Sequence, residues 1–500
     1  MNKDTMMDDV KRELIDNGTQ SCRRFINAPG FLGPFLRAFV TAVERDGDSG
    51  GRVPRAVYLV GGCVRDLFMS CLLPEQPVKK GDVDIVVTGC AEMGALLAAV
   101  ESMRNSVPLR GVQHVISDFP VVKVFPAGWH GCLDIALART GEMSTGPGHR
   151  DFRFTTRDVS IEDDLLRRDF SINAIALRII VTAGDLDCET VDVSCGIDDL
   201  LRRRIAAIGD AKIRYREDPI RQVRAIRFAA ELFDAGFRLE EGTYQAIKTV
   251  YPETYQDISR EPFVCEVGKA LTANFPFAYE QLSQSGILAR SLPFLDGWDV
   301  TARECVSAMI GAIAGDAHAP SVWVPLLFWA VRGDGERTFH DRVMRLPRNF
   351  HIPPLTHHVR SMKLPRVIAH QVRLFAIMRY YGEFLWSVAA FEDAYKHVPK
   401  RQRSPFMVML TTLMGCDGLD PGEIDHLVTR ITDAPESPPR DECARFFAAN
   451  DIPAGPLRAE MMFHARDCQL TEDGIKSDFF HNALLWHERR KTTQSVEKKK

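Results

Sequence analysis

The chain has no Cys-x-x-Cys pair, although its 500 residues include 12 cysteines scattered from Cys22 to Cys468. This absence argues against a zinc ribbon and a disulfide framework, and it indicates reduced thiols in a cytosol. The longest apolar run, Val322 to Val331, is too short to span a bilayer. Charged residues occupy the N-terminal stretch where a signal peptide would be apolar. The sequence therefore predicts a cytoplasmic protein without a membrane segment.

A large excess of positive charge is also lacking, because the formal net charge is −4 and the pI is about 6.4. This excludes a polybasic coat for nucleic acid, so any RNA contact must come from a local patch. The composition, with 45% apolar and 26% charged residues, is typical of globular proteins. The length favours two to four domains.

Hydrophobic periodicity separates an α/β part from a helical part. One amphipathic helical pattern surrounds Phe25 to Val43, and the glycine-rich residues 47–52 indicate a linker. Helical and extended patterns then alternate, with elements expected at 56–60, 62–70, 83–87, 91–102, 112–116, 120–125 and 132–137. From about residue 195 the pattern is almost wholly helical. We therefore predict an α+β fold, an N-terminal α/β head with a mixed sheet followed by a long all-α region.

Asp82 and Asp84 are the first candidates for chemistry. Alternate residues of a strand point to one face, so this spacing brings the two carboxylates close together. Like charges at such a distance repel unless a cation neutralises them. Hard oxygen ligands, completed by substrate phosphates, suit Mg²⁺. The pair predicts a Mg²⁺ site, whereas a lone Asp-x-Asp is more often a turn or a solvated strand edge.

Features around this pair favour a phosphate site. Gly61-Gly62 ends a strand and opens a helix, where backbone N–H groups can approach phosphate oxygens. Arg65, one turn later, can reach the same phosphates. A third catalytic carboxylate is expected on a neighbouring strand, and the apolar neighbours of Asp134 place it on a sheet face. The alternatives for that role are Asp163, Asp164 and Asp169.

Residues 161–177 hold a second set of polar candidates. Asp169, followed by Ser171, Asn173 and apolar residues, is typical of a capped helix start. Arg167-Arg168 just before it could hold a triphosphate. Asp169 or Asn173 could bond a ribose 2′-OH.

Residues 215–232 predict a helix that begins at Asp218-Pro219 as N-cap and first turn. Arg221, Arg224 and Arg227 recur every three residues and form one drifting positive stripe. The apolar positions Val223, Ile226 and Ala230 are expected to be buried, which leaves the stripe free to face a ligand. Asp218 and Arg221 together offer an acceptor and a forked donor for the edge of a base.

These segments together resemble the class II tRNA nucleotidyltransferases and the related bacterial poly(A) polymerases, within the DNA polymerase β superfamily. Five blocks carry the resemblance in order: LVGGCVRD with GDVDIVV, DIALART at 134–140, EDDLLRRDFSINAIAL, VDVSCGIDDLLRRRI at 191–205 and REDPIRQVRAIRFAAEL. They cover about residues 55–260. The resemblance implies that Asp82 and Asp84 bind catalytic metal ions and that Gly62 and Arg65 contact the triphosphate.

The same resemblance assigns the later blocks to the nucleotide. It implies that Arg168 contacts the nucleotide and that Asp169 senses the 2′-OH. Asp218 and Arg221 would act as a protein template for CTP or ATP, with Arg224 and Arg227 near the phosphates. Residues 191–205 match the family's hinge.

The resemblance fades after about residue 260. The expected domains are 1–54, an extension and linker; 55–180, the nucleotidyltransferase head; 181–260, nucleotide-reading neck helices; 261–490, an RNA-binding helical body and tail; and 491–500, a disordered lysine-rich end. His340-Asp341 lacks suitably spaced upstream partners, so no second metal site of the phosphohydrolase type is expected. A basic run could instead clamp the tRNA backbone; it contains Arg360, Lys363, Arg366 and Arg373.

The leading hypothesis is a magnesium enzyme that adds CCA to tRNA 3′ ends from CTP and ATP by two-metal phosphoryl transfer. The nearest alternative is a poly(A) polymerase acting on other RNA 3′ ends, but such polymerases tend to have a strongly basic C-terminal region that this chain lacks. Another alternative is a partial enzyme that adds only A or only CC. A non-catalytic nucleotide sensor would predict a broken metal pair, whereas both aspartates are present.

Overall fold

The computed structural model describes residues 3–313 apart from 46–51, 76–81, 91, 105–106, 116–119, 128, 130, 145–151 and 294. It also describes Val322, Leu326, residues 440–450 and scattered positions up to His487. The chain divides into two compact units, residues 1–291 and 292–500. The phosphohydrolase dipeptide, the basic run at 360–373 and the lysine-rich end lie outside the described residues.

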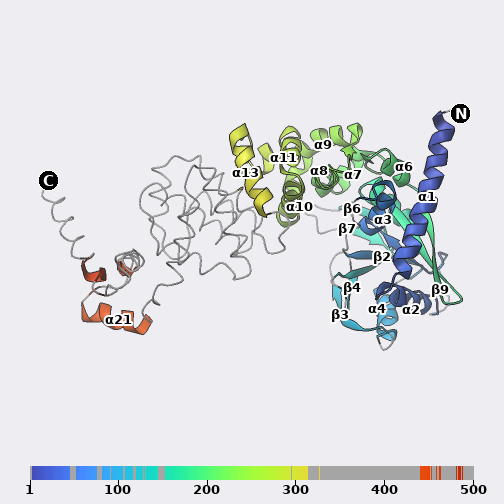
Figure 1. The fold of residues 1–500 in the computed structure, drawn as a ribbon, viewed down its shortest axis with the longest axis horizontal. Coiled ribbons are helices and arrows are strands. Elements are labelled where there is room, and N and C mark those ends of the chain that lie inside the picture. The colour runs from blue at the N-terminus through green and yellow to red at the C-terminus, as the bar shows by residue number, and fades with distance from the viewer. Residues whose placement is uncertain are drawn as a thin grey trace. The chain divides into compact units, whose positions relative to one another are not determined.

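The first unit joins a sheet with its helices to a run of further helices (Figure 1). Its first elements are α1 (Lys3–Asn27), α2 (Leu32–Arg45), β1 (Ala56–Val60), α3 (Gly62–Leu72), β2 (Val83–Thr88), α4 (Met93–Ser102), β3 (Leu109–Val115), β4 (Val121–Pro126), β5 (Leu133–Leu137), β6 (Thr140–Ser144) and β7 (Phe152–Thr155). They continue with α5 (Ile161–Leu166), the 3₁₀ turn η1 (Ser171–Asn173), β8 (Ile175–Thr182), β9 (Asp185–Asp192), α6 (Gly196–Leu201), β10 (Arg204–Ile205), α7 (Ala211–Glu217), α8 (Ile220–Glu231), β11 (Arg238–Leu239), α9 (Glu241–Thr254), the 3₁₀ turn η2 (Tyr255–Asp257), α10 (Arg260–Ala273), α11 (Phe275–Gln284) and α12 (Ile287–Ser291).

The main sheet has seven strands in the order β3-β4-β5-β2-β1-β8-β9. The pair β2–β5 is parallel and the other neighbouring pairs are antiparallel, so the sheet is mixed, as predicted. Every residue of the central strand β1 is buried, which fits its unbroken apolar sequence. The α+β fold, with a mixed-sheet head followed by helices, is confirmed.

The second unit is described only in part. Its described elements are α13 (Val300–Ile313) and α21 (Arg440–Ala449). Around α21, Cys443, Phe447 and Met461 are buried in one apolar cluster. Both described elements are helices, in agreement with the helical pattern of the sequence. The finer domain boundaries given above stay predictions.

The N-terminal segment forms two helices, so the expectation of one continuous pattern around Phe25 to Val43 is wrong. Gly30 has a φ of +143°, which ends the first helix in a turn before α2 begins. Helix α1 packs along β9, where Thr19 Oγ1 lies 2.7 Å from Thr190 Oγ1 and Asn27 Nδ2 donates to the Leu186 carbonyl at 3.0 Å. Both helices thus belong to the first unit, and α1 contacts the edge strand of its sheet.

The interpretation of Asp169 as a helix cap is also wrong. The helix of this region is α5, which Ser160 caps through a reciprocal pair of hydrogen bonds with Asp163. Asp169 precedes the short η1 turn, and the apolar run that follows forms β8 rather than a helix. Its β-branched residues pair on one side with β1 and on the other with β9, and this pairing decided between strand and helix.

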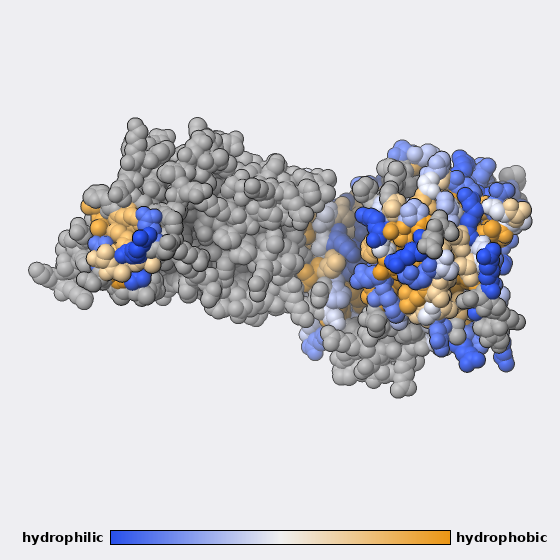
Figure 2. Space-filling view, turned by 90° about the horizontal axis from the view of Figure 1, so that it is seen from below, coloured by the Kyte–Doolittle hydropathy of each residue, from blue (hydrophilic) through white to orange (hydrophobic). Residues whose placement is uncertain are grey.

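One face of the sheet carries the core that borders the site. Tyr58, Val60 and Val86 are buried there in one cluster with Ile161 and Leu165 of α5. Because Asp84 is two residues from Val86 and pairs with Val60 in the register, its side chain belongs to the same face. The face of the first unit drawn in Figure 2 interleaves hydrophilic and hydrophobic residues over its surface.

Among the described residues, no single helix is long and apolar enough to cross a membrane. Helices α1 and α2 pass that test only as a pair that bends by 94°. Their apolar residues, such as Ile26, Phe35 and Phe39, are buried within the unit.

Candidate active site

A row of three charged residues crosses the strands β4, β5 and β2. Asp84 pairs with Asp134 in the parallel register of β2 and β5, and Asp134 pairs with Lys123 in the antiparallel register of β4 and β5. Residues paired in this way project from the same face of a sheet. The Lys123 ammonium group forms an ion pair with Asp134 Oδ2. The sheet thus places one cation and two carboxylates side by side.

Asp82 lies just before β2, so only Asp84 of the predicted pair is within the strand. Asp82 Oδ1 accepts a hydrogen bond of 2.9 Å from the backbone N–H of Cys132. The Cys132 thiol donates in turn to Asp134 Oδ1 at 3.1 Å. These two contacts fix the start of β5 beside β2 and bring all three predicted catalytic carboxylates to one end of the strand pair.

The carboxylates of this end carry more negative charge than the protein neutralises. Burial by surrounding protein atoms raises the pKa of Asp84, and the nearby charges of Asp134 and Asp82 raise it further against the opposing effect of Arg168 and Lys123. A divalent cation would relieve this repulsion. Oxygen donors of this kind suit Mg²⁺, which usually takes one or two carboxylates together with substrate phosphates.

The side chains fit such an ion through Asp82 and Asp84 rather than through a complete protein cage. In the described part of the chain, no group of three or more His, Cys, Asp or Glu side chains is arranged to hold a metal ion. Asp134, the third candidate, is engaged by Lys123. The fit is therefore to a site that substrate oxygens complete.

The turn between β1 and α3 approaches the same carboxylate. Gly61 has a φ of +76°, and a Cβ added to it would lie 2.9 Å from Asp84 Oδ2. Any larger residue would therefore be strained and would meet the carboxylate. Helix α3 begins at Gly62, as predicted, so the N–H groups of its first turn start at the Gly61 turn that adjoins Asp84.

Arg65 faces the protein interior. Its guanidinium donates to Asp66 Oδ1 at 2.7 and 2.9 Å and to Asn173 Oδ1 at 3.0 Å, and it lies 5.6 Å from the ring centre of Phe228. The side chain is buried. In this conformation Arg65 connects α3 to η1 and α8, and a contact with phosphates would require it to exchange partners.

Asp164 of α5 binds the two arginines that follow this helix. It is fully buried and accepts from Arg167 at 2.6 Å through one oxygen and from Arg168 at 2.9 Å through the other. These two guanidinium groups offset the cost of burial and hold the pKa of Asp164 below its usual value. Arg168 thereby points to the Gly61 turn, where its Nη1 lies 3.9 Å from the position that a Cβ on Gly61 would occupy.

The three alternatives for the third carboxylate all have other partners. Asp164 binds two arginines, Asp163 belongs to the capping box of α5, and Asp169 pairs with Arg224. The structure brings Asp134 next to Asp84 in the sheet and brings none of these three into that register.

Asp169 forms a bridge to helix α8. Its Oδ2 accepts from Arg224 Nε at 2.9 Å and from Nη2 at 2.6 Å. Its Oδ1 accepts from the Phe170 N–H at 2.8 Å and from Asn173 Nδ2 at 3.4 Å. Although burial opposes ionisation, the guanidinium of Arg224 holds the pKa of Asp169 below its usual value. The same carboxylate raises the pKa of Arg224.

Helix α8 begins at Ile220, and Asp218 Oδ1 accepts from the Ile220 N–H at 3.3 Å. The helix thus starts slightly later than predicted, with Asp218 still bonded to its first turn. Val223, Ile226 and Ala230 are buried, which confirms that part of the pattern.

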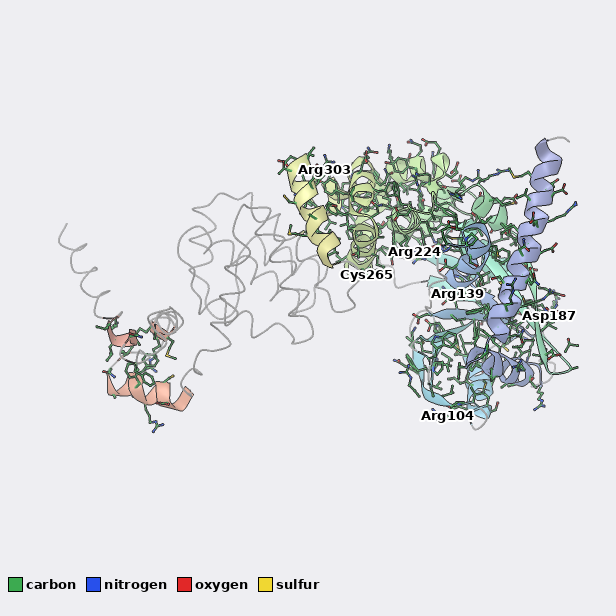
Figure 3. The ribbon with its side chains drawn as sticks, in the orientation of Figure 1. Arg104, Arg139, Asp187, Arg224, Cys265 and Arg303 are labelled. Carbon is green, nitrogen blue, oxygen red and sulfur yellow. The ribbon has the colours of Figure 1, made fainter. Side chains whose placement is uncertain are left out.

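The expectation that the arginine stripe is free for a ligand is wrong. Arg221 is buried and donates to the Arg167 carbonyl at 3.0 Å. Arg227 forms ion pairs with Glu231 at 2.8 Å and Glu266 at 2.6 Å. Figure 3 labels Arg224 on the helical part of the unit, above Arg139 of the head. The arginines of α8 lie at a packed boundary, where carboxylates from other elements compete with any ligand.

Sequence reasoning missed several residues of this region, of which Lys123 is the most prominent. Its signal was a lysine within the apolar segment VVKVF, the extended run before the block that begins at Asp134. Phe228 was also missed, although the guanidinium groups of Arg224 and Arg227 lie 5.5 and 4.0 Å from its ring centre. An aromatic residue directly after the three arginines of the helix was the available signal.

Comparison with known proteins extends this description. Residues 57–206 match the family model described as poly A polymerase head domain. A multifunctional CCA protein of Vibrio cholerae is 37% identical over 243 residues, which cover 48% of this chain and 52% of that protein. A protein of the same name from Acinetobacter baumannii is 35% identical over 243 residues, 48% of this chain and 51% of that protein. The chain thus spans about half the length of the curated relatives it matches.

Solved structures share the fold. A CCA-adding enzyme in its apo form II matches with a TM-score of 0.55 at 22% identity, over 93% of this chain and 96% of that one. The Bacillus stearothermophilus CCA-adding enzyme in complex with CTP matches with a TM-score of 0.55 at 22% identity, over 92% of this chain and 99% of that one. The resemblance inferred from the five sequence blocks is confirmed.

Proposed function

Because residues 57–206 match the model of the poly A polymerase head domain, we propose that the chain is a template-independent RNA nucleotidyltransferase that adds CCA to tRNA 3′ ends. The substrates are CTP, ATP and a tRNA that lacks its last three nucleotides. The similarity to multifunctional CCA proteins supports this choice. One observation of the structure carries it: the Gly61 turn at the start of α3 directly adjoins the carboxylate of Asp84.

In the proposed reaction, the terminal ribose 3′-OH attacks the α-phosphorus of the nucleotide and pyrophosphate leaves. Asp82 and Asp84 are the residues that would hold Mg²⁺. When bound, a pair of such ions supplies activation of the attacking hydroxyl and stabilisation of the leaving group. The first N–H groups of α3, from Gly62 onward, bind phosphate oxygens, because a helix N-terminus attracts anions.

The arginines and the neck then select the nucleotide. Arg168, held by Asp164 toward the Gly61 turn, binds the phosphates. Asp169 accepts from the ribose 2′-OH, and Arg65 and Arg224 support that part of the site through Asn173 and Asp169. Asp218 and Arg221 read the base, which requires Arg221 to give up its bond to the Arg167 carbonyl. Arg227 holds α8 in place through its ion pairs with Glu231 and Glu266.

The test is incorporation by the full chain on tRNA that ends before CCA. We expect CTP alone to add two residues, and CTP with ATP to complete CCA, as read by sequencing of the products. An unrelated RNA with a free 3′-OH is the control and should remain unextended. Long A tails on that control would overturn the proposal in favour of poly(A) polymerase. Extension only by A, or only by CC, would identify a partial enzyme.

The cytoplasmic location stays a prediction.

A further inference from the structure

Lys123 is a residue of the charged row that the proposed reaction does not use. It lies on β4, two strands from Asp84, and its ammonium group pairs with Asp134 between them. We propose that Lys123 is a positioning residue that competes with the metal ion for Asp134 and thereby lowers the metal affinity of the nucleotide-free site. This inference rests on the proposed metal site at Asp82 and Asp84.

The backbone register fixes the geometry of this competition. Lys123, Asp134 and Asp84 are direct neighbours across three strands, and the spacing between strands is about 4.8 Å. Asp134 therefore has the Lys123 ammonium group on one side and, on the other, Asp84, one of the two carboxylates proposed to bind the metal ion. A rotation of one side chain is enough to move its oxygens from one neighbour to the other.

The exposure of the pair allows the exchange. The Lys123 and Asp134 side chains are 33% and 26% exposed, so neither charge is sealed in the core. An ion pair of this exposure is modest in strength, which lets a divalent cation compete. The Cys132 thiol holds the other oxygen of Asp134, so the carboxylate keeps one contact during the exchange.

The charge balance gives the direction of the effect. With Lys123 present, metal binding must break the Lys123–Asp134 pair or proceed with only two carboxylates. Without the ammonium group, Asp134 is available to the ion as a third carboxylate. Removal of Lys123 should therefore tighten metal binding, whereas removal of a residue that merely supports the fold would weaken it.

The experiment measures Mn²⁺ binding to the full chain without nucleotide or RNA, by the loss of the free-ion paramagnetic resonance signal. We expect Lys123→Met to bind Mn²⁺ about five- to tenfold more tightly than wild type, because Asp134 is released from a partly exposed ion pair. Lys123→Arg keeps the charge and should bind as wild type does. Equal or weaker Mn²⁺ binding by Lys123→Met would overturn the inference.

A double variant tests whether Lys123 acts through Asp134. In an Asp134→Asn background the Lys123→Met change should alter Mn²⁺ affinity by less than about twofold, because the contested ligand is gone. A full effect in that background would show simple charge repulsion and would overturn the competition. Asp84→Asn should abolish binding at this site. If Asp84→Asn leaves Mn²⁺ binding intact, the proposed metal site is wrong. If Asp84→Asn abolishes binding but Lys123→Met does not tighten it, the metal site stands and the competition is wrong.

Discussion

The charged row of the sheet (Lys123, Asp134 and Asp84) and helix α8 differ in how their charges are paired. In the row, Asp84 and Asp134 are neighbours because the β2–β5 register makes them so, and their repulsion helps to raise the pKa of Asp84. On α8, Arg224 is paired with Asp169 and Arg227 with Glu231 and Glu266. In the row one cation, Lys123, stands against two carboxylates, whereas Arg224 and Arg227 of the helix are each paired with carboxylates of the chain itself.

This difference in charge pairing distinguishes residues that take part in the proposed reaction from residues that stabilise the fold. A group of like charges that the protein leaves unmatched gains stability only when a ligand arrives, which is typical of a functional site. Removal of an arginine that pairs with a buried carboxylate is costly whether or not a ligand is bound, because the carboxylate is then left buried without its partner. We therefore expect substitutions in the row to change incorporation more than stability, and substitutions of the α8 pairs to change both.

The largest effect is expected for Asp84→Asn in the row. Loss of one metal-binding carboxylate should lower nucleotide incorporation by about 10³-fold or more, because several kcal/mol of charge stabilisation disappear. Nucleotide incorporation is measured on tRNA lacking CCA, and tRNA binding is measured by filter retention. The affinity for tRNA should stay unchanged.

Asp187→Asn is the matched control for this change. Asp187 lies on the edge strand β9, which β1 and β8 separate from β2 in the sheet, and it pairs with Arg23. The control should incorporate nucleotide at the wild-type rate. Near-normal incorporation by Asp84→Asn would contradict the view that the row acts in the reaction whereas the α8 pairs mainly stabilise the fold.

A smaller effect, on stability, is expected for Arg224→Met on α8. The buried Asp169 carboxylate would lose its bidentate partner, which costs about 3 kcal/mol in unfolding free energy. Chemical denaturation measures this cost. The double variant Asp169→Asn with Arg224→Met should lose less than the sum of the single variants. Unchanged stability with lost incorporation would instead make Arg224 a ligand contact of the same kind as the row.

The pH dependence of stability tests the same pair. Arg224 holds the pKa of Asp169 below the ordinary aspartate value of about 3.9, so the pair contributes its full stability above that value. As pH falls through the lowered folded pKa, protonation of Asp169 removes the contribution. The difference in unfolding free energy between wild type and Asp169→Asn should therefore be constant above about pH 5 and shrink below about pH 4. A difference that does not change down to about pH 2 would contradict the pair's role.

The smallest effect is expected for Ser160→Ala at the start of α5. Ser160 Oγ accepts from the Asp163 N–H at 3.2 Å, and its loss should cost about 1 kcal/mol. The melting temperature should fall by about 2–4 °C, while Ser160→Thr, which keeps the oxygen, should stay near wild type. If both variants melt like wild type, the cap does not hold the helix that carries Asp164.

The outcome of sequence reasoning differed between these regions for physical reasons. Strands 56–60 and 83–87 and the helix after Gly61 were located closely, because alternation and a glycine pair are local signals. The segment from Asp169 to Leu177 was assigned to a helix, although it forms η1 and the start of β8. Its conformation depends on pairing with β1 and β9, and such contacts do not appear in a local window.

By itself, the sequence determined the residue types and spacing of the site: an aspartate pair, a glycine turn, and blocks rich in arginine that match a known family. Only the tertiary structure decided which charges meet. The sheet register set Asp134 between Asp84 and Lys123, and the packing of α8 on η1 joined Arg224 to Asp169. Electrostatic energy depends on the distance between charges in space. The sequence separation of these pairs does not determine that distance, which only the folded structure sets.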